Sequence, residues 1–230
     1  MGGMGSRIAL ALAIAVATFG TVSGVANAAA TIQSNADSYT FLPGPYVQGL
    51  GEIAIFDNSA SPAYHDVTAT QTGPDGRPLF FAQALAGGQT GQVKGTQYLT
   101  AGTYPFYCQL HGAGMSGELT IDGSSGAVVR RPSVKVSFVR QKLKQVRRVG
   151  VRVKVRAATA STGVGITAKK GKVVLGSKRG LSFKTGQTRT LLLPLTKAGR
   201  KAIRKGKAVK INLRATVAFG KPSSATRKVR

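Results

Sequence analysis

Residues Thr103–Ile121 read Thr-Tyr-Pro-Phe-Tyr-Cys-Gln-Leu-His-Gly-Ala-Gly-Met-Ser-Gly-Glu-Leu-Thr-Ile. Aromatic and apolar residues at both ends and a glycine-rich centre predict a strand, a tight loop and a second strand. The loop carries Cys108, His111 and Met115 within eight residues. A thiolate, an imidazole and a thioether are therefore expected to lie in one short turn.

These donor types together favour copper. A soft thiolate and two imidazoles bind copper in one plane, and a weak thioether caps it. The loop has one imidazole, and the sequence contains only one other histidine, His65. Zinc is the competing metal, but its sites use several Cys or His ligands and rarely a thioether. A single Cys or Met is ordinarily a core residue, yet three of the four donors cluster here. The predicted ligands are His65, Cys108, His111 and Met115.

The charge distribution divides the chain into two unlike halves. The 230 residues carry a formal net charge of +26. All seven acidic residues lie before residue 123, and only Arg7, Arg77 and Lys94 lie there with them. From Gly123 onward there are 30 Lys and Arg residues and no Asp or Glu. This asymmetry predicts two domains, and the single Cys excludes a disulfide within the chain.

The N-terminus has the pattern of an export signal. Arg7 precedes an unbroken apolar run, Ile8–Val16, and small residues lead to Ala26-Asn27-Ala28. Residues 1–28 are therefore predicted to be a signal peptide, because the run is shorter than the ~20 residues that span a bilayer. An uncleaved anchor and a buried helix are the alternatives. Export would leave the lone thiol in an oxidising space, where an unoccupied Cys is a liability.

Residues 29–122 have the pattern of a small all-β domain, a sandwich or a barrel, with no helical period. The expected strands are Glu52–Phe56, His65–Thr70, Pro78–Leu85, Gln92–Leu99, Gly102–Tyr107 and Glu118–Ile121. Turn clusters separate them, such as Asp57-Asn58-Ser59 and Gly73-Pro-Asp-Gly76.

Residues 123–132 are predicted to be a linker, beginning with the flexible joint Gly123–Ala127. Residues 133–230 are predicted to form a second, basic, immunoglobulin-like β-sandwich. Apolar and cationic residues alternate from Val149 to Arg156 and again from Lys210 to Val217, so one face of each strand is apolar. Further strands are expected at Val134–Val139, Val164–Ala168, Val173–Leu175 and Thr190–Leu195. One helix is predicted at Lys197–Lys205, with Thr196 as its N-cap.

The first domain resembles the cupredoxins, the plastocyanin and azurin family of type 1 blue copper proteins. The resemblance covers Thr31–Asp122 and lies in Gly102–Cys108, His111, Gly114–Met115, Gly117–Ile121, Phe56–Asn58 and His65–Val67. It implies a Greek-key β-sandwich, with His65, Cys108 and His111 as equatorial ligands and Met115 as the axial one. Asn58 and Asp66 fall where the family orders its ligand loops. The His-to-Met gap of three residues departs from plastocyanin-like loops, which have four, and from amicyanin-like loops, which have two.

The resemblance implies an exported protein that binds one copper ion and carries single electrons between redox partner proteins, with His111 as the electron port. It is not expected to be an enzyme, because both histidines are used and oxidases and nitrite reductases need further copper ligands. A copper carrier or store, and an adhesive module that has lost its metal, are the alternatives. The basic half is expected either to bind an anionic cell-envelope polymer or membrane surface, or to be only a solvated face. Nucleic acid is not the expected partner of an exported chain.

Overall fold

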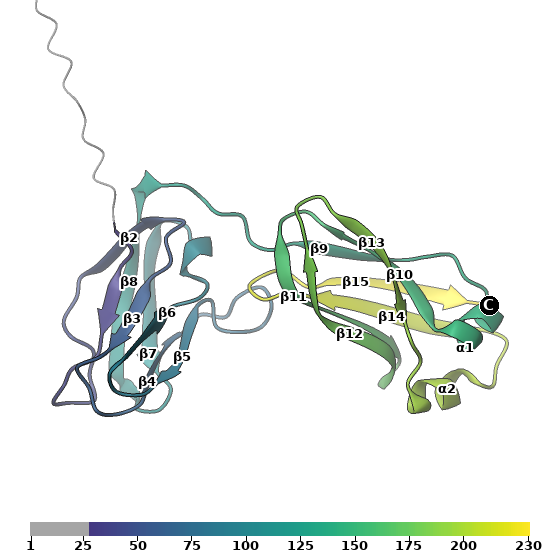
Figure 1. The fold of residues 1–230 in the computed structure, drawn as a ribbon, viewed down its shortest axis with the longest axis horizontal. Helices are drawn as coiled ribbons and strands as arrows, with labels where there is room; N and C mark the ends of the chain where they lie inside the picture. The colour runs from purple at the N-terminus through teal and green to yellow at the C-terminus, as the bar shows by residue number, and fades with distance from the viewer. Residues whose placement is uncertain (1–27) are drawn as a thin grey trace, which may run out of the picture.

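The computed structural model describes residues 28–230, and both halves of this range are all-β, as predicted (Figure 1). The predicted signal peptide lies outside the described residues, apart from Ala28. Among the described residues, no helix has both the length and the apolar character to cross a bilayer. Buried apolar side chains form two separate clusters, one within residues 30–121 and one within residues 134–229. We call residues 28–122 the N-terminal half and residues 123–230 the basic half.

Two sheets build the N-terminal half. Its strands are β1 (Thr31–Gln33), β2 (Tyr46–Leu50), β3 (Ile55–Asn58), β4 (His65–Ala69), β5 (Phe81–Leu85), β6 (Gln89–Gln92), β7 (Gly102–Cys108) and β8 (Gly112–Gly126). One sheet has the order β1-β3-β6 and the other β2-β8-β7-β4-β5. The pairs β1–β3 and β2–β8 are parallel, and the rest are antiparallel. Phe56 from the smaller sheet and Phe106 from the larger are fully buried in the shared core.

The strand predicted at Gln92–Leu99 is wrong. Strand β6 ends at Gln92, and Thr96–Tyr98 form a single 3₁₀ turn, η1. The buried Thr96 hydroxyl donates to the carbonyl of Val93 (3.0 Å) and accepts from the backbone N–H of Ala54 (2.9 Å). A threonine side chain that hydrogen-bonds to backbone groups in this way satisfies them without the hydrogen-bond ladder of a strand.

The flexible joint predicted from Gly123 is also wrong in its first four residues, because β8 continues to Gly126. The strand pairs in parallel with β2, and the register ends at Leu50 opposite Gly126. Gly126 has φ +79°, and a Cβ there would lie 2.1 Å from the carbonyl oxygen of Leu50. The glycine that suggested flexibility is therefore needed for close approach of two strands.

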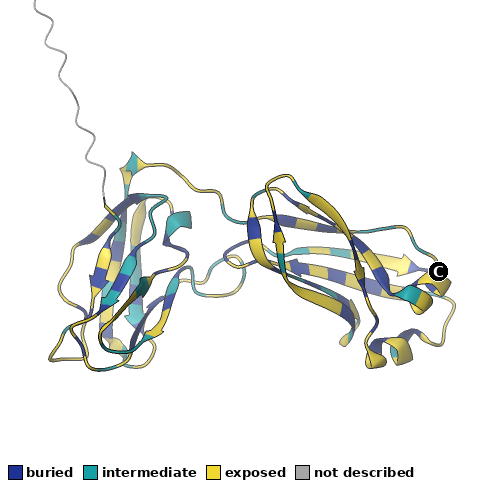
Figure 2. Cartoon of the chain, viewed as in Figure 1, coloured by how far each residue is buried: buried dark blue, intermediate teal, exposed yellow. Residues whose placement is uncertain are grey.

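The basic half is built from two antiparallel sheets around one core. Its elements are β9 (Val134–Phe138), α1 (Leu143–Val149), β10 (Val151–Ala157), β11 (Ser161–Lys170), β12 (Val173–Phe183), β13 (Thr188–Leu193), α2 (Lys197–Ile203), β14 (Val209–Thr216) and β15 (Ser223–Val229). The sheet orders are β13-β10-β9 and β12-β11-β14-β15. Figure 2 shows buried and exposed residues alternating along these strands. The immunoglobulin-like assignment stays a prediction.

The predicted helix is confirmed as α2, with the Thr196 hydroxyl accepting from the N–H of Gly199 (2.8 Å). Helix α1 was not predicted, and strand β10 starts two residues later than expected. Leu143 and Val146 have helical spacing and are both buried, and Gly150, at φ +105°, ends the helix. The helix was missed because its last residue, Val149, also fits the alternation of apolar and cationic residues that predicts strand β10.

Phe219 joins the two halves. Its ring centroid lies 5.8 Å from those of Phe81 and Tyr98, and its backbone N–H donates to Asp75 Oδ2 (2.8 Å). Arg131 stacks over the ring of Tyr98 at 5.9 Å. Phe219 has φ +61°, a conformation that a bulky residue adopts only where its surroundings hold it. The halves therefore contact each other through an aromatic cluster as well as through the connecting chain.

Two pairs of cations lie directly opposite each other on neighbouring strands. Lys210 of β14 pairs with Lys228 of β15, and Lys135 of β9 pairs with Arg156 of β10. All four side chains are exposed. Like charges directly opposite in an antiparallel ladder are destabilising, so both pairs oppose folding.

We expect Lys228→Thr to raise the free energy of unfolding of the basic half by about 0.5 kcal/mol, because it removes the repulsion with Lys210. Urea unfolding at low salt measures the change. Lys169→Thr is the matched control, since Lys169 is also exposed in a strand of this sheet but lies opposite Asn212 and Val174. Equal stabilisation by both variants would assign the effect to strand propensity, not to charge.

Candidate metal centre

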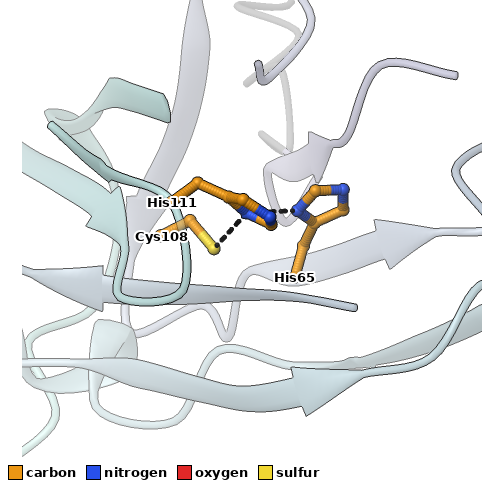
Figure 3. Close-up of side chains that lie close together, drawn as sticks. All are labelled: His65, Cys108 and His111. Carbon is orange, nitrogen blue, oxygen red and sulfur yellow. Dashed lines mark hydrogen bonds between the residues drawn. The ribbon is translucent and has the colours of Figure 1, made fainter. Parts of the chain in front are cut away.

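Three of the predicted ligands converge at one end of the N-terminal half. Nδ1 of His65 lies 3.1 Å from Nδ1 of His111, which lies 3.4 Å from Sγ of Cys108 (Figure 3). One donor atom from each residue falls within 4.8 Å of the others. His65 and Cys108 are fully buried, and His111 is half-buried. Residues 46 positions apart in the chain are thus brought to a common point.

Neighbouring strands place these side chains. Cys108 is the last residue of β7 and His65 the first of β4, and the two strands are antiparallel partners. The turn between β7 and β8 is closed by the N–H of His111, which donates to the carbonyl of Cys108 (3.3 Å). This tight turn directs both the thiol and the imidazole toward His65.

Asp66 ties the two ligand segments together. Its backbone N–H donates to Sγ of Cys108 (3.4 Å), and its carboxylate accepts from the N–H of Gln109 at 3.1 Å from each oxygen. It also accepts from the hydroxyl of Thr68 (3.0 Å). A backbone N–H aimed at the sulfur stabilises negative charge there, which is the form a metal binds. Asp66 thus orders the loop, the role that the cupredoxin resemblance implies for it.

Ser61 holds the far side of the His65 ring. Its hydroxyl lies 3.0 Å from Nε2 of His65 and accepts from the N–H of Ala63 (3.2 Å). A hydrogen bond at one ring nitrogen sets which tautomer the other presents. With the proton on Nε2, Nδ1 offers a lone pair toward Cys108 and His111. Sequence reasoning missed Ser61, since a serine four residues before a histidine carries no signal of its own.

Asn58 anchors the loop that leads to His65. Its side-chain amide donates to the carbonyls of Ala63 (2.8 Å) and Leu85 (2.9 Å), and its oxygen accepts from the hydroxyl of Ser34 (2.6 Å). The residue is fully buried, and each bond satisfies a group that would otherwise be costly to bury. Three separate segments are therefore joined beside the candidate ligand, in agreement with the resemblance.

Tyr39 covers His111 and was also missed, because no spacing links it to the ligand loop. The two rings stack with centroids 4.4 Å apart and planes 17° from parallel. Tyr39 stands edge-on to His65 at 6.1 Å, yet it is 62% exposed. Turn hydrogen bonds hold its loop, including the N–H of Asn35 to the carbonyl of Thr40 (2.9 Å). The Tyr39 ring therefore lies between solvent and part of the half-buried His111 imidazole.

Met115 is fully buried on β8. Tyr107 of β7 pairs with Ser116 of β8, and after an irregularity Cys108 pairs with Gly112, so Ala113, Gly114 and Met115 lie between the two paired positions. The axial role of Met115 stays a prediction.

The donor set suits copper. A buried thiol with two imidazoles makes the His₂Cys group of type 1 copper sites, in which a weak thioether is the fourth donor. Hydrogen bonds from Asp66, Ser61 and Asn58 hold the ligand segments in place, so the three donor groups need little rearrangement to bind an ion. The cluster of His65, Cys108 and His111 fits a type 1 copper site.

No family model matches this chain. Among solved structures it is similar to auracyanin A, a "blue" copper protein from the green thermophilic photosynthetic bacterium Chloroflexus aurantiacus, at 18% identity and a TM-score of 0.34 over 40% of this chain and 96% of that one. It is also similar to dithionite-reduced auracyanin from Roseiflexus castenholzii (18% identity, TM-score 0.34, 41% and 98% covered). A purple cupredoxin from Nitrosopumilus maritimus matches at 17% identity and a TM-score of 0.30, with 40% and 99% covered. Each of these matches covers about 40% of this chain and nearly the whole of the other chain.

The metal-free protein should lose stability on acidification. Burial lowers the pKa of His65 below its ordinary 6.5, His111 lowers it further, and Asp66 opposes the shift. Below pH 6.5 the unfolded chain takes up a proton that folded His65 resists, so the free energy of unfolding falls as pH drops toward the folded pKa. Urea unfolding from about pH 8 to pH 5 measures this. His65→Gln should lack that component, and an identical pH profile in the variant would contradict the assignment.

Replacing Tyr39 should expose His111. We expect Tyr39→Leu to speed modification of His111 by diethyl pyrocarbonate about fivefold in the metal-free protein, as loss of a ring pair worth about 1 kcal/mol implies. The chain has only two histidines, and His65 is fully buried, so the reaction is simple to assign by mass. Tyr64→Leu is the matched control, because Tyr64 is also 62% exposed and adjoins His65. An equal effect of both variants would exclude a specific cover.

Proposed function

We propose that this chain is an exported type 1 copper protein that carries single electrons between redox partner proteins. The observation that supports it is the group of His65, Cys108 and His111, whose donor atoms lie within 4.8 Å of one another at one end of the sandwich. Copper held there would supply a one-electron change between its cuprous and cupric forms. We assign His65, Cys108 and His111 as equatorial ligands and Met115 as the axial ligand.

The protein's part is to hold these donors still. The backbone N–H of Asp66 stabilises the thiolate, Ser61 keeps the Nε2 proton of His65, and Asn58 fixes the loop between them. Donors that do not move between oxidation states keep the energy of rearrangement small. That property serves electron transfer more than it serves catalysis.

His111 is the ligand through which electrons would enter and leave. It is the one equatorial donor residue that is not fully buried, and Tyr39 lies against it. A partner docking at this end would contact Tyr39 and the neighbouring Leu110, which is 54% exposed.

A copper carrier or store is the second candidate. The single solvent-reachable imidazole would let copper be handed on, but the chain offers one set of donors, whereas storage favours many. Slow exchange of copper with a chelator together with fast electron self-exchange would favour the electron carrier. The reverse would favour the store.

For the basic half we propose attachment of the copper site to an anionic cell-envelope polymer or membrane surface. It has no His, Cys, Asp or Glu, so it offers neither metal ligands nor the usual acid–base groups. Its 30 cations are the remaining chemical feature.

Copper binding is tested by adding Cu(II) to the purified protein lacking residues 1–28. We expect an intense absorption band at about 600 nm, from a copper–thiolate bond, and its loss in Cys108→Ser. Met115→Leu conserves volume in the buried site, so it should keep the colour and shift the reduction potential.

A protein that stays colourless with copper and binds zinc instead would overturn the proposal. An unchanged potential in Met115→Leu would exclude Met115 as the axial ligand without touching the other three. Ser116→Ala, an exposed neighbour on β8, controls for general effects of substitution in this turn.

A further inference from the structure

Eight of the 30 cations of the basic half lie on two opposite outer faces of its sheets. Alternate residues of β10 and β14 enter one common core, so the other set on each strand points outward from its own sheet. The first cationic face, on β9 and β10, consists of Lys135, Arg152, Lys154 and Arg156. The second, on β11, β14 and β15, consists of Lys169, Lys210, Arg214 and Lys228. All eight side chains are exposed.

Neither cationic face contains the acidic residues that are usually interspersed with Lys and Arg on a surface that serves only solubility. From Gly123 to Arg230 there is no Asp or Glu to pair with them. Each face even contains a cross-strand like-charge pair, Lys135 with Arg156 and Lys210 with Lys228. Solubility needs net charge but not cations placed in direct opposition. An anion bridging each pair would remove a repulsion that the fold otherwise bears.

A cationic hollow borders the second face, between the end of β15 and the chain that follows β9. It has a volume of about 400 Å³ and is lined by Arg140, Lys142, Arg227, Lys228 and Arg230, among others. Strands β9 and β15 are the edge strands of their sheets and contact each other. Lys228 belongs both to the hollow and to the second face. The hollow therefore extends the positive charge of the second face to Arg140 and Lys142, which follow β9.

This distribution favours a flexible chain over a flat surface. A membrane can neutralise only the face that rests on it, and it would leave the opposite face and its like-charge pair exposed to water. A linear polyanion can bend around the edge formed by β9 and β15 and contact both faces. Single-stranded nucleic acid also bends, but its bases need aromatic platforms. Phe183 and Phe219 are buried and Phe138 is half-buried, and these are the aromatic residues of the basic half.

We propose that the basic half binds a linear, phosphate-bearing polyanion that wraps around the β9–β15 edge and contacts both cationic faces. The inference deepens the proposed attachment role and does not depend on copper. Binding is dominated by release of counterions from the polymer, so affinity should fall steeply with salt.

Long-chain inorganic polyphosphate is the probe, titrated by fluorescence anisotropy of labelled polymer at several salt concentrations. The proteins are the chain lacking residues 1–28 and two triple variants, Lys135→Gln/Lys154→Gln/Arg156→Gln and Lys210→Gln/Arg214→Gln/Lys228→Gln. We expect each triple variant to lower the slope of log affinity against log salt by about two, and both together to lower it about twice as much. Thr188→Gln and Thr226→Gln, exposed neutral residues on the same strands or their neighbours, are the matched controls.

Loss from only one triple variant, with equally tight binding to phosphatidylglycerol vesicles, would overturn wrapping in favour of a flat membrane. Equal competition by tripolyphosphate at the same phosphate concentration would reduce the site to a local anion contact. If polyphosphate does not bind even at low salt, the proposal is wrong and the cations form only a solvated surface. Repeating the titration with Cys108→Ser separates this proposal from the copper site, because polyphosphate affinity should be unchanged when the colour is lost.

Discussion

The candidate site depends on one link, between Asp66 and the loop that follows β7. A backbone N–H from β4 reaches the Cys108 sulfur, and the carboxylate of the same residue binds the N–H of Gln109. Since Asp66 adjoins His65, this link fixes the distance between the ligand on β4 and the ligands after β7. The thiolate gains a donor, and the turn that carries His111 gains an anchor.

Around this link the chain adds support in layers. The Ser61 hydroxyl hydrogen-bonds to Nε2 of His65, and the Asn58 side chain joins three segments next to this ligand. Tyr39 closes the solvent side by stacking on His111. Ligands held through their own hydrogen bonds keep one orientation without a metal, which is the preorganisation that rapid electron transfer requires. A loosely held set of the same residues would suit storage better.

The basic half obeys a different constraint. Strands β10 and β14 bury every second residue and expose every intervening one to water, so a half with 30 cations and no acids places positive charge on both outer faces of its sandwich. Phe219 packs against Phe81 and Tyr98, which places this charged body against the copper-site half and not merely after it. Binding of a polyanion would then bring the candidate electron carrier to the polymer as well.

The sequence by itself determined the all-β class, the predicted ligand set and the segregation of charge, because donor chemistry, alternation and composition are local properties of a chain. Cys108, His111 and Met115 share one turn, and His65 is the single remaining imidazole. The ends of strands were harder to predict from the sequence, because Thr96 and Gly126 act through partners distant in sequence. Only the tertiary structure decided that Ser61 and Tyr39 flank the two imidazoles and that exposed cations form two opposed faces, one of which borders a cationic hollow. Contacts between remote segments depend on strand order and register, which no local pattern encodes.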